Sequence, residues 1–173
     1  MSIQDEIIDR WQRGMLFPIL PKAKGEPVRR ALFVNEALNS VLNSPEGDET
    51  WDKRVGSLRA DLEVFVAAPT IGPKYLFLLY PALDAVWEIR STSHEPSIRV
   101  LCLFALKDVL IATGHALRED LGEWESREWK KVKREAKAAW RRVFDPYRPA
   151  KGTDAKQLVT GALDGKYFKT FIR

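Results

Sequence analysis

Three short apolar runs between residues 86 and 115 constrain the fold of this chain more than any other feature of its sequence. The runs are Val86–Thr92, Ile98–Phe104 and Val109–His115, and each is rich in β-branched or aromatic residues. The turn-prone segments SHEP and ALKD separate them. This pattern predicts a three-stranded antiparallel meander. The last two runs are apolar at nearly every position, which is typical of strands covered on both faces.

Helical spacing precedes these runs. Pro27 suits the first position of a helix, and apolar residues follow it at helical intervals as far as Leu42. After a polar turn, a continuous apolar stripe from Trp51 to Val66 predicts a second helix. Pro69 ends this helix, because the residue before a proline avoids helical geometry. The short connection between the two predicts an antiparallel helical hairpin.

A third helix is predicted after Ser126, which is a good N-cap, and it ends at Asp145-Pro146. One side carries apolar residues from Trp129 to Val143. The opposite side is predicted to be exposed and basic, with Lys130, Lys131, Lys133, Arg134, Lys137, Arg141 and Arg142.

The elements follow the order helix–helix–strand–strand–strand–helix, with a short helical segment around Ile3, Ile7 and Trp11 and a candidate edge strand near Met15–Leu20. Helices segregated from strands predict an α+β fold, in which the helical hairpin packs on one face of the three-stranded sheet and a basic C-terminal helix follows. Residues 1–145 are predicted to form the domain, including an N-terminal extension, and residues 146–173 a C-terminal tail.

Length and composition predict one ordinary globular domain, since the chain has 173 residues, of which 45% are hydrophobic and 30% charged. Its single cysteine, Cys102, excludes an internal disulfide and a multi-cysteine zinc site, and its apolar surroundings predict a buried residue. No segment resembles a membrane span or a signal peptide, so we expect a cytoplasmic protein without a membrane partner. With two histidines and no cofactor motif, no metal site and no cofactor are predicted.

Charge is distributed unevenly along the chain. Residues 1–96 have a formal charge of −3, whereas residues 97–173 have +7. A basic second half favours an anionic partner such as RNA. A basic surface that contacts only solvent is the alternative.

Four residues near strand ends could form one catalytic site. Arg90 ends the first strand, Arg99 opens the second, and His115 and Arg118 follow the third. In an antiparallel meander these strand ends are neighbours, so the side chains could converge at one rim of the sheet. Two guanidinium groups would suit a phosphate, and an imidazole could transfer protons. The alternative is structural: Arg90 could pair with Glu88 or Glu95, and Arg99 could be solvated.

The stretch Ala85–Arg118, AVWEIRSTSHEPSIRVLCLFALKDVLIATGHALR, resembles the RelE/HigB-like toxins of bacterial toxin–antitoxin pairs, and most of all their phage-derived branch. The similar features are a strand reading like WEIR, a strand that opens with arginine, and a strand that ends in a Gly/His/Arg cluster before a basic helix. The resemblance spans roughly residues 27–145, and its motifs are short.

The resemblance implies a metal-independent endoribonuclease that cleaves mRNA at the ribosome, by attack of a ribose 2′-OH on the adjacent phosphate. Arg90 and Arg99 would hold the phosphate, and His115 and Arg118 would supply proton transfer and charge. Lys130, Lys131, Lys133 and Arg134 would bind the RNA backbone.

The partners that the resemblance implies are a cognate antitoxin, expected to be a helix-turn-helix protein, and mRNA on the ribosome. A second copy of the chain is a further candidate partner, through the C-terminal tail. Two other functions stay open. One is a toxin that acts like the gyrase inhibitors, and the other is a non-catalytic module that binds nucleic acid or protein.

Overall fold

A computed structural model describes residues 2–90 and 97–160 of the chain. Its elements along the chain are α1 (Ile3–Gln12), β1 (Leu16–Pro18), β2 (Ala31–Asn35), α2 (Glu36–Leu42), α3 (Glu49–Ala67), β3 (Leu76–Leu78), β4 (Trp87–Ile89), β5 (Ile98–Leu106), β6 (Val109–Leu117) and α4 (Arg127–Phe144). Short 3₁₀ turns η1 (Ala82–Asp84), η2 (Arg118–Asp120) and η3 (Ala155–Gln157) connect them.

The sheet has six strands within these residues, in the order β1-β2-β6-β5-β4-β3. The antiparallel meander β4-β5-β6 is its centre, as the sequence predicts. The α+β class is confirmed, but the prediction of a three-stranded sheet is wrong. β3 extends the meander on one side, and β2 and β1 extend it on the other. Because β2 runs parallel to β6, the sheet is mixed. The predicted edge strand is β1, and the end of the first predicted strand, at Thr92, lies outside the described residues.

The predicted helix from Pro27 to Leu42 is wrong in its first half. Residues 31–34, ALFV, form the buried strand β2, and only Glu36–Leu42 is helical. An apolar run of this length fits a buried strand as well as a helix, and its pairing with β6 decides between them. Asn35 then begins α2, because its side chain accepts a hydrogen bond from the backbone N–H of Leu38. The helical hairpin is therefore absent from the described structure, and a strand and a short helix precede α3.

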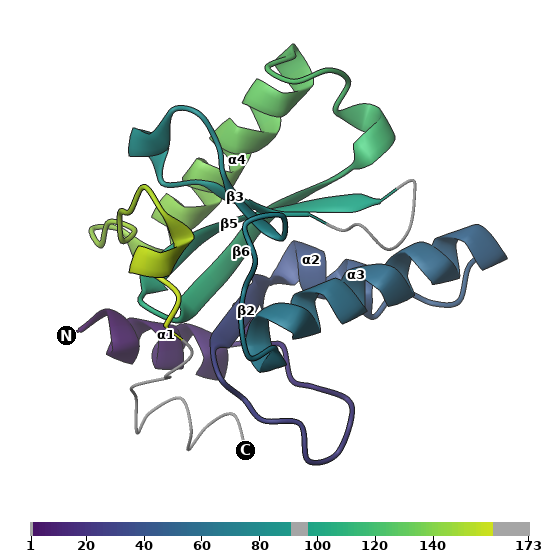
Figure 1. The fold of residues 1–173 in the computed structure, drawn as a ribbon, viewed down its shortest axis with the longest axis horizontal. Helices are drawn as coiled ribbons and strands as arrows, with labels where there is room; N and C mark the ends of the chain where they lie inside the picture. Colours follow the sequence, from purple (N-terminus) through teal and green to yellow (C-terminus); the bar gives the residue numbers. More distant parts are fainter. Residues whose placement is uncertain (1, 91–96, 161–173) are drawn as a thin grey trace.

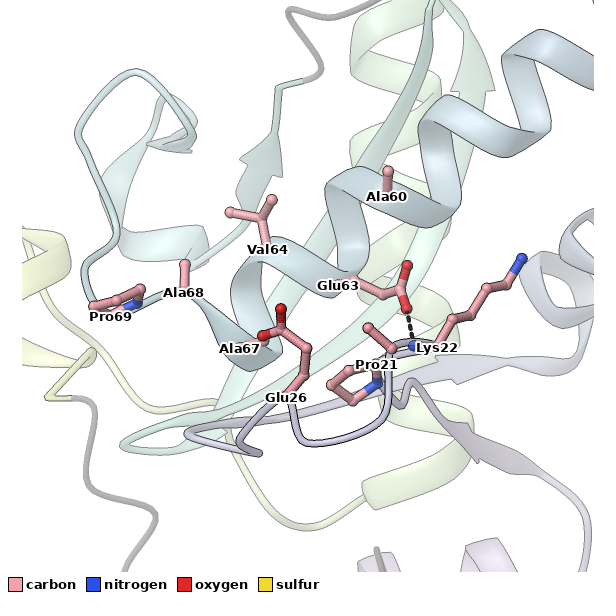
Figure 2. A pocket seen from close by; sticks show the side chains of 10 residues that line it. Pro21, Lys22, Glu26, Ala60, Glu63, Val64, Ala67, Ala68 and Pro69 are labelled. Carbon is pink, nitrogen blue, oxygen red and sulfur yellow. Dashed lines mark hydrogen bonds between the residues drawn. The ribbon is translucent and has the colours of Figure 1, made fainter.

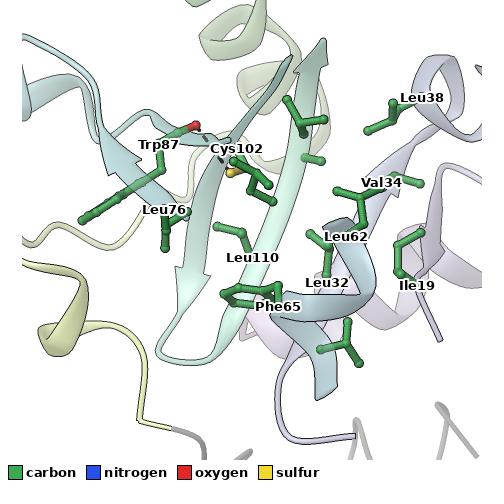
Figure 3. Packing of buried hydrophobic residues seen from close by; sticks show 14 of the residues in the cluster. Ile19, Leu32, Val34, Leu38, Leu62, Phe65, Leu76, Trp87, Cys102 and Leu110 are labelled. Atoms are coloured by element: carbon green, nitrogen blue, oxygen red, sulfur yellow. Dashed lines mark hydrogen bonds between the residues drawn. The ribbon is translucent and has the colours of Figure 1, made fainter. Parts of the chain in front are cut away.

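Helices cover both faces of the sheet, not one face as predicted (Figure 1). On one face, α1 and α4 pack on a core that includes Phe33, Leu101 and Trp140. On the other face, α2 and α3 pack on a second core. Figure 3 shows this second core, with Leu38 of α2 and Leu62 and Phe65 of α3 beside Leu32, Trp87, Cys102 and Leu110 of the strands. Cys102 is fully buried, and burial raises the pKa of its thiol well above the usual value.

Two arginine side chains donate hydrogen bonds to carbonyl groups at the C-terminal end of α3. Pro69 has no N–H to donate to the carbonyl of Phe65, so the last turn leaves carbonyl groups without helical partners. The Arg30 guanidinium is buried and donates hydrogen bonds to the carbonyls of Phe65 and Ala68. Arg29 donates from Nε to the carbonyl of Ala67 at 3.1 Å. These contacts tie β2 to α3 in an otherwise apolar layer.

Residues 146–160, the described part of the predicted tail, lie against the β5–β6 hairpin. The backbone N–H of Ala150 donates to the carbonyl of Phe104 at 2.8 Å, and that of Asp108 donates to Leu158 at 2.8 Å. Leu158 is buried in the second core, on the face covered by α2 and α3, which we call the α3-side core. The core on the face covered by α1 and α4 is the α4-side core. This segment is thus held along the sheet rather than projecting from it. Among the helices that the structure describes, none is long and apolar enough to cross a membrane.

Candidate functional site

Arg90 and Arg99 meet at one end of the sheet, but they meet on a carboxylate. Glu88 of β4 is 1% exposed, and its two oxygens accept from Arg99 Nη1 at 3.0 Å and from Arg90 Nε at 3.3 Å. The Arg90 guanidinium also lies 4.1 Å from the centre of the Phe77 ring. The structural alternative of an ion pair with Glu88 is therefore what the structure contains, while Glu95 lies outside the described residues. We refer to Glu88, Arg90 and Arg99 as the Glu88 triad.

His115 lies on the other face of the sheet from Arg99. Arg99 is paired with Ala116, which packs on the α4-side core, whereas His115 is paired with Val100, whose side chain belongs to the α3-side core. Paired residues of antiparallel strands point to the same face, and neighbours along a strand point to opposite faces. The sheet therefore separates the imidazole from the two guanidinium groups.

An irregularity in the β5–β6 ladder causes this separation. The register shifts between Leu101 and Cys102, because Leu101 pairs with Gly114 but Cys102 pairs with Ala112. Thr113 is the extra residue of the bulge. If the register of Cys102 and Ala112 continued unbroken, Arg99 would be paired with His115. One inserted residue exchanges the two faces of the strand beyond it.

Arg118 is hydrogen-bonded neither to the Glu88 triad nor to His115 among the described residues. It begins η2, and its Nη1 donates to the carbonyl of Gly122 at 2.9 Å, within its own loop. The neighbouring Glu119 pairs with Arg54 of α3 through two contacts of 2.7 Å, and hydrogen bonding to Arg54 lowers the pKa of that carboxyl. The Arg54–Glu119 pair is not predictable from the sequence, because nothing in either segment indicates the other. Of the four predicted catalytic residues, only Arg90 and Arg99 are brought together.

The position of His115 predicts a pH effect on stability. Burial lowers the pKa of His115 below the ordinary value of 6.5. The unfolded chain then binds a proton at His115 at a higher pH than the folded chain, so the free energy of unfolding should fall as the pH drops below about 6.5. In His115→Gln this part of the fall should be missing. Urea unfolding of both proteins between neutral and mildly acidic pH measures it, and parallel pH profiles would contradict the expectation.

The outer face of α4 is rich in exposed cations. Ser126 caps the helix by accepting from the N–H of Trp129, and residues 127–144 have a formal charge of +6. Six cations of this helix are exposed, and together they are called the basic face of α4: Arg127, Lys130, Lys131, Arg134, Arg141 and Arg142. At 1.5 Å per residue they span about 22 Å along the axis. Two exposed carboxylates, Glu128 and Glu135, belong to the same helix, and the contact of Glu135 with Lys131 is 4.0 Å long and exposed on both sides.

Two predicted outward cations of α4 have partners instead. Lys133 is buried, and its Nζ donates to the carbonyl of Tyr80 at 2.7 Å and to Glu125 at 3.1 Å. Lys137 pairs with Asp84 at 2.8 Å. Lys133 follows Trp129 by four residues, so helical spacing places it on the buried stripe. Of the four residues predicted to bind RNA, Lys130, Lys131 and Arg134 are exposed and Lys133 is not.

Two surface hollows of about 490 Å³ lie away from the Glu88 triad. The first is between α3 and the segment that precedes β2 (Figure 2). There the backbone N–H of Lys22 donates to Glu63 at 2.5 Å, and Glu26 is a second carboxylate. The rest of its lining is mostly alanine, valine and proline. These side chains are neither nucleophiles nor general bases. The second hollow is at the C-terminal end of α4.

No known protein family, curated protein or solved structure matches this chain. The resemblance to the RelE/HigB-like toxins, and the partners that it implies, therefore stay predictions.

Proposed function

We propose that this chain binds nucleic acid, with RNA as the favoured class, through the basic face of α4. The observation that carries the proposal is the arrangement of six exposed cations along one side of α4. Phosphate groups attract such a strip whatever the base sequence, because each Lys or Arg that neutralises a phosphate releases bound counterions. Arginine adds bidentate contacts to phosphate oxygens.

The packing of α4 supports this role. Its apolar side, with Trp129, Ala136 and Trp140, is buried against β5 and β6. Gly114 of β6 allows close contact, since an added Cβ would lie 3.0 Å from that of Ala136. A helix fixed on its inner side keeps the backbone of its outer cations in place. Contacts to phosphate then need only side-chain ordering.

Fluorescence anisotropy with a short labelled single-stranded RNA, recorded over a range of salt concentrations, tests the proposal. Binding should weaken steeply with salt. The variant Lys130→Gln/Arg134→Gln should reduce affinity about 10-fold or more at physiological salt. It should also reduce the slope of log affinity against log salt by about 0.7 for each phosphate that the variant no longer neutralises.

The matched control is Lys24→Gln/Lys53→Gln. It removes the same charge from exposed positions on the α3 side of the molecule, so it should leave both affinity and salt slope nearly unchanged. An equal loss in both variants would mean that net charge, rather than the basic face of α4, determines binding. A wild-type chain that does not bind RNA at low salt would exclude the function.

The endoribonuclease function of the toxin family is the second candidate, and one observation favours it: Arg90 and Arg99 do converge. Both, however, contact the buried Glu88, and His115 is on the opposite face. The same RNA, incubated with the chain alone and with ribosomes, separates the two functions. Intact RNA is expected. Cleavage that is lost in both Arg99→Ala and His115→Ala would support the nuclease instead.

A further inference from the structure

The hollow at the C-terminal end of α4 has the size and the lining of a small-ligand site. It lies between the last turns of α4, the η1 turn and residues 145–151, with Leu103 of β5 among its lining residues. Its volume of about 490 Å³ is in the range of sites that hold small molecules and single nucleotides. We call it the α4 hollow.

Positive charge predominates in the α4 hollow. Its cations are Lys137, Arg141, Arg148 and Lys151, and its carboxylates are Asp84 and Asp145. Asp84 is already paired with Lys137. Arg141, Arg148 and Lys151 make no ion pair with any residue of the described ranges. Apart from the Lys137–Asp84 pair, the lining therefore has three cations and one carboxylate, Asp145. A doubly charged anion would neutralise the remaining charge.

The end of α4 opposes an anion only weakly. A helix C-terminus carries partial negative charge, which weakly disfavours a nearby anion. Here the last carbonyls already accept hydrogen bonds, since Val143 accepts from Arg10 Nε at 3.1 Å and Phe144 from the N–H of Tyr147 at 2.7 Å. A hydrogen bond between charged groups is stronger than the effect of a helix end on a nearby charge. The three cations outweigh the helix end.

Aromatic and apolar groups form the rest of the lining. Trp140 and Tyr147 lie together, because the Trp140 Nε1 donates to the carbonyl of Tyr147 at 2.9 Å. Leu83 is 78% exposed at the edge of the hollow. Pro146 and Pro149 restrict the backbone, and the bond from Ala150 to Phe104 attaches this segment to β5. Apolar lining beside cations suits a nucleobase attached to a phosphate.

We propose that the α4 hollow binds the phosphorylated end of a nucleic-acid strand that lies along the basic face of α4. This inference rests on the proposed function and specifies its ligand. Arg141 belongs to both the face and the hollow, so a strand that follows the helix reaches the hollow at its end. A terminal phosphate carries a charge of about −1.5 to −2 at neutral pH, whereas an internal phosphodiester carries a single negative charge. Three cations therefore favour the terminal phosphate.

The experiment compares anisotropy titrations of one RNA sequence with a 5′-phosphate, a 3′-phosphate or hydroxyl ends. The wild-type chain should bind one phosphorylated form about 10-fold more tightly than the hydroxyl form. In Arg148→Gln/Lys151→Gln, two exposed positions outside α4, this preference should disappear while binding of the hydroxyl form changes little. Lys130→Gln/Arg134→Gln should weaken binding of all three RNAs equally and keep the preference.

Calorimetry with adenosine monophosphate separates the two proposals. If RNA does not bind but the mononucleotide does, and Arg148→Gln/Lys151→Gln abolishes its binding, the hollow is a phosphate site and the function of the basic face is wrong. If RNA binds with no preference for its end group and the mononucleotide does not bind, the inference on the hollow is overturned and the function stands. Mononucleotide binding that persists in the variant would place its site elsewhere and would also overturn the inference.

Discussion

Glu88→Leu is expected to lower the free energy of unfolding by about 3 kcal/mol. The substitution leaves Arg90 and Arg99 without their counterion on the face of the sheet that α4 covers. Glu88 is 1% exposed, and the side chain of Arg99 is 14% exposed. In the variant, Arg99 therefore stays largely out of water without a counterion, whereas Arg90 is 37% exposed. Urea unfolding monitored by tryptophan fluorescence measures the loss.

The double variant Glu88→Leu/Arg99→Met is the control. Replacing both buried charges with apolar side chains of similar size should recover most of the lost stability, because the cost comes from the unpaired charge and not from the missing bond. Arg99→Met alone should be destabilised, since Glu88 then depends on the more exposed Arg90. If Arg99→Met were as stable as the wild type, Arg99 would be available for a ligand. That outcome would favour the phosphate-binding role that the toxin resemblance implies.

Arg30→Met is expected to lower the free energy of unfolding by about 3 to 6 kcal/mol, which corresponds to the loss of two charge-assisted hydrogen bonds. The methionine fills part of the space but donates nothing, so the carbonyls of Phe65 and Ala68 lose their donors at the buried end of α3. The cation also lies over the Phe65 ring, 5.7 Å from its centre. Burial lowers the pKa of Arg30, and the nearby Asp108 opposes this shift. Thermal and urea unfolding would both report the loss.

Arg29→Met is the matched comparison at the next position. Arg29 is partly exposed and its side chain donates a hydrogen bond to the carbonyl of Ala67, so its replacement should cost about 1 kcal/mol. Equal effects of the two substitutions would show that the end of α3 does not depend on the buried guanidinium.

Local patterns were sufficient where an element forms from its own residues and its immediate neighbours. The stripe from Trp51 to Val66 forms α3, and the N-cap Ser126 begins α4. They were insufficient where a distant partner decides the structure. Residues 31–34 form a strand because residues 109–112 lie beside them in the fold, and no helical or strand period within ALFV reveals that pairing.

The candidate site was predictable to the same extent. Neighbouring strands bring Arg90 and Arg99 together, as the meander requires. His115 is on the other face because of the extra residue at Thr113, and a bulge leaves no sign in the pattern of apolar residues. The letters WEIR indicate Glu88 only as an alternative partner for Arg90, since the burial of a carboxylate cannot be read from them. The basic face of α4 follows from helical spacing, which also explains why Lys133 is not part of it.

The parallel pairing of β2 with β6 affects how the chain emerges from the ribosome. Ala31 pairs with Val109, so β2 is complete long before its inner neighbour has been synthesised. Until then its apolar ALFV edge has only the short β1 to pair with. Unpaired strand edges of nascent chains are prone to misassociate. The β6-facing edge of β2 therefore lacks its native partner during the synthesis of the whole intervening chain, and it is the edge at which misassociation is expected first.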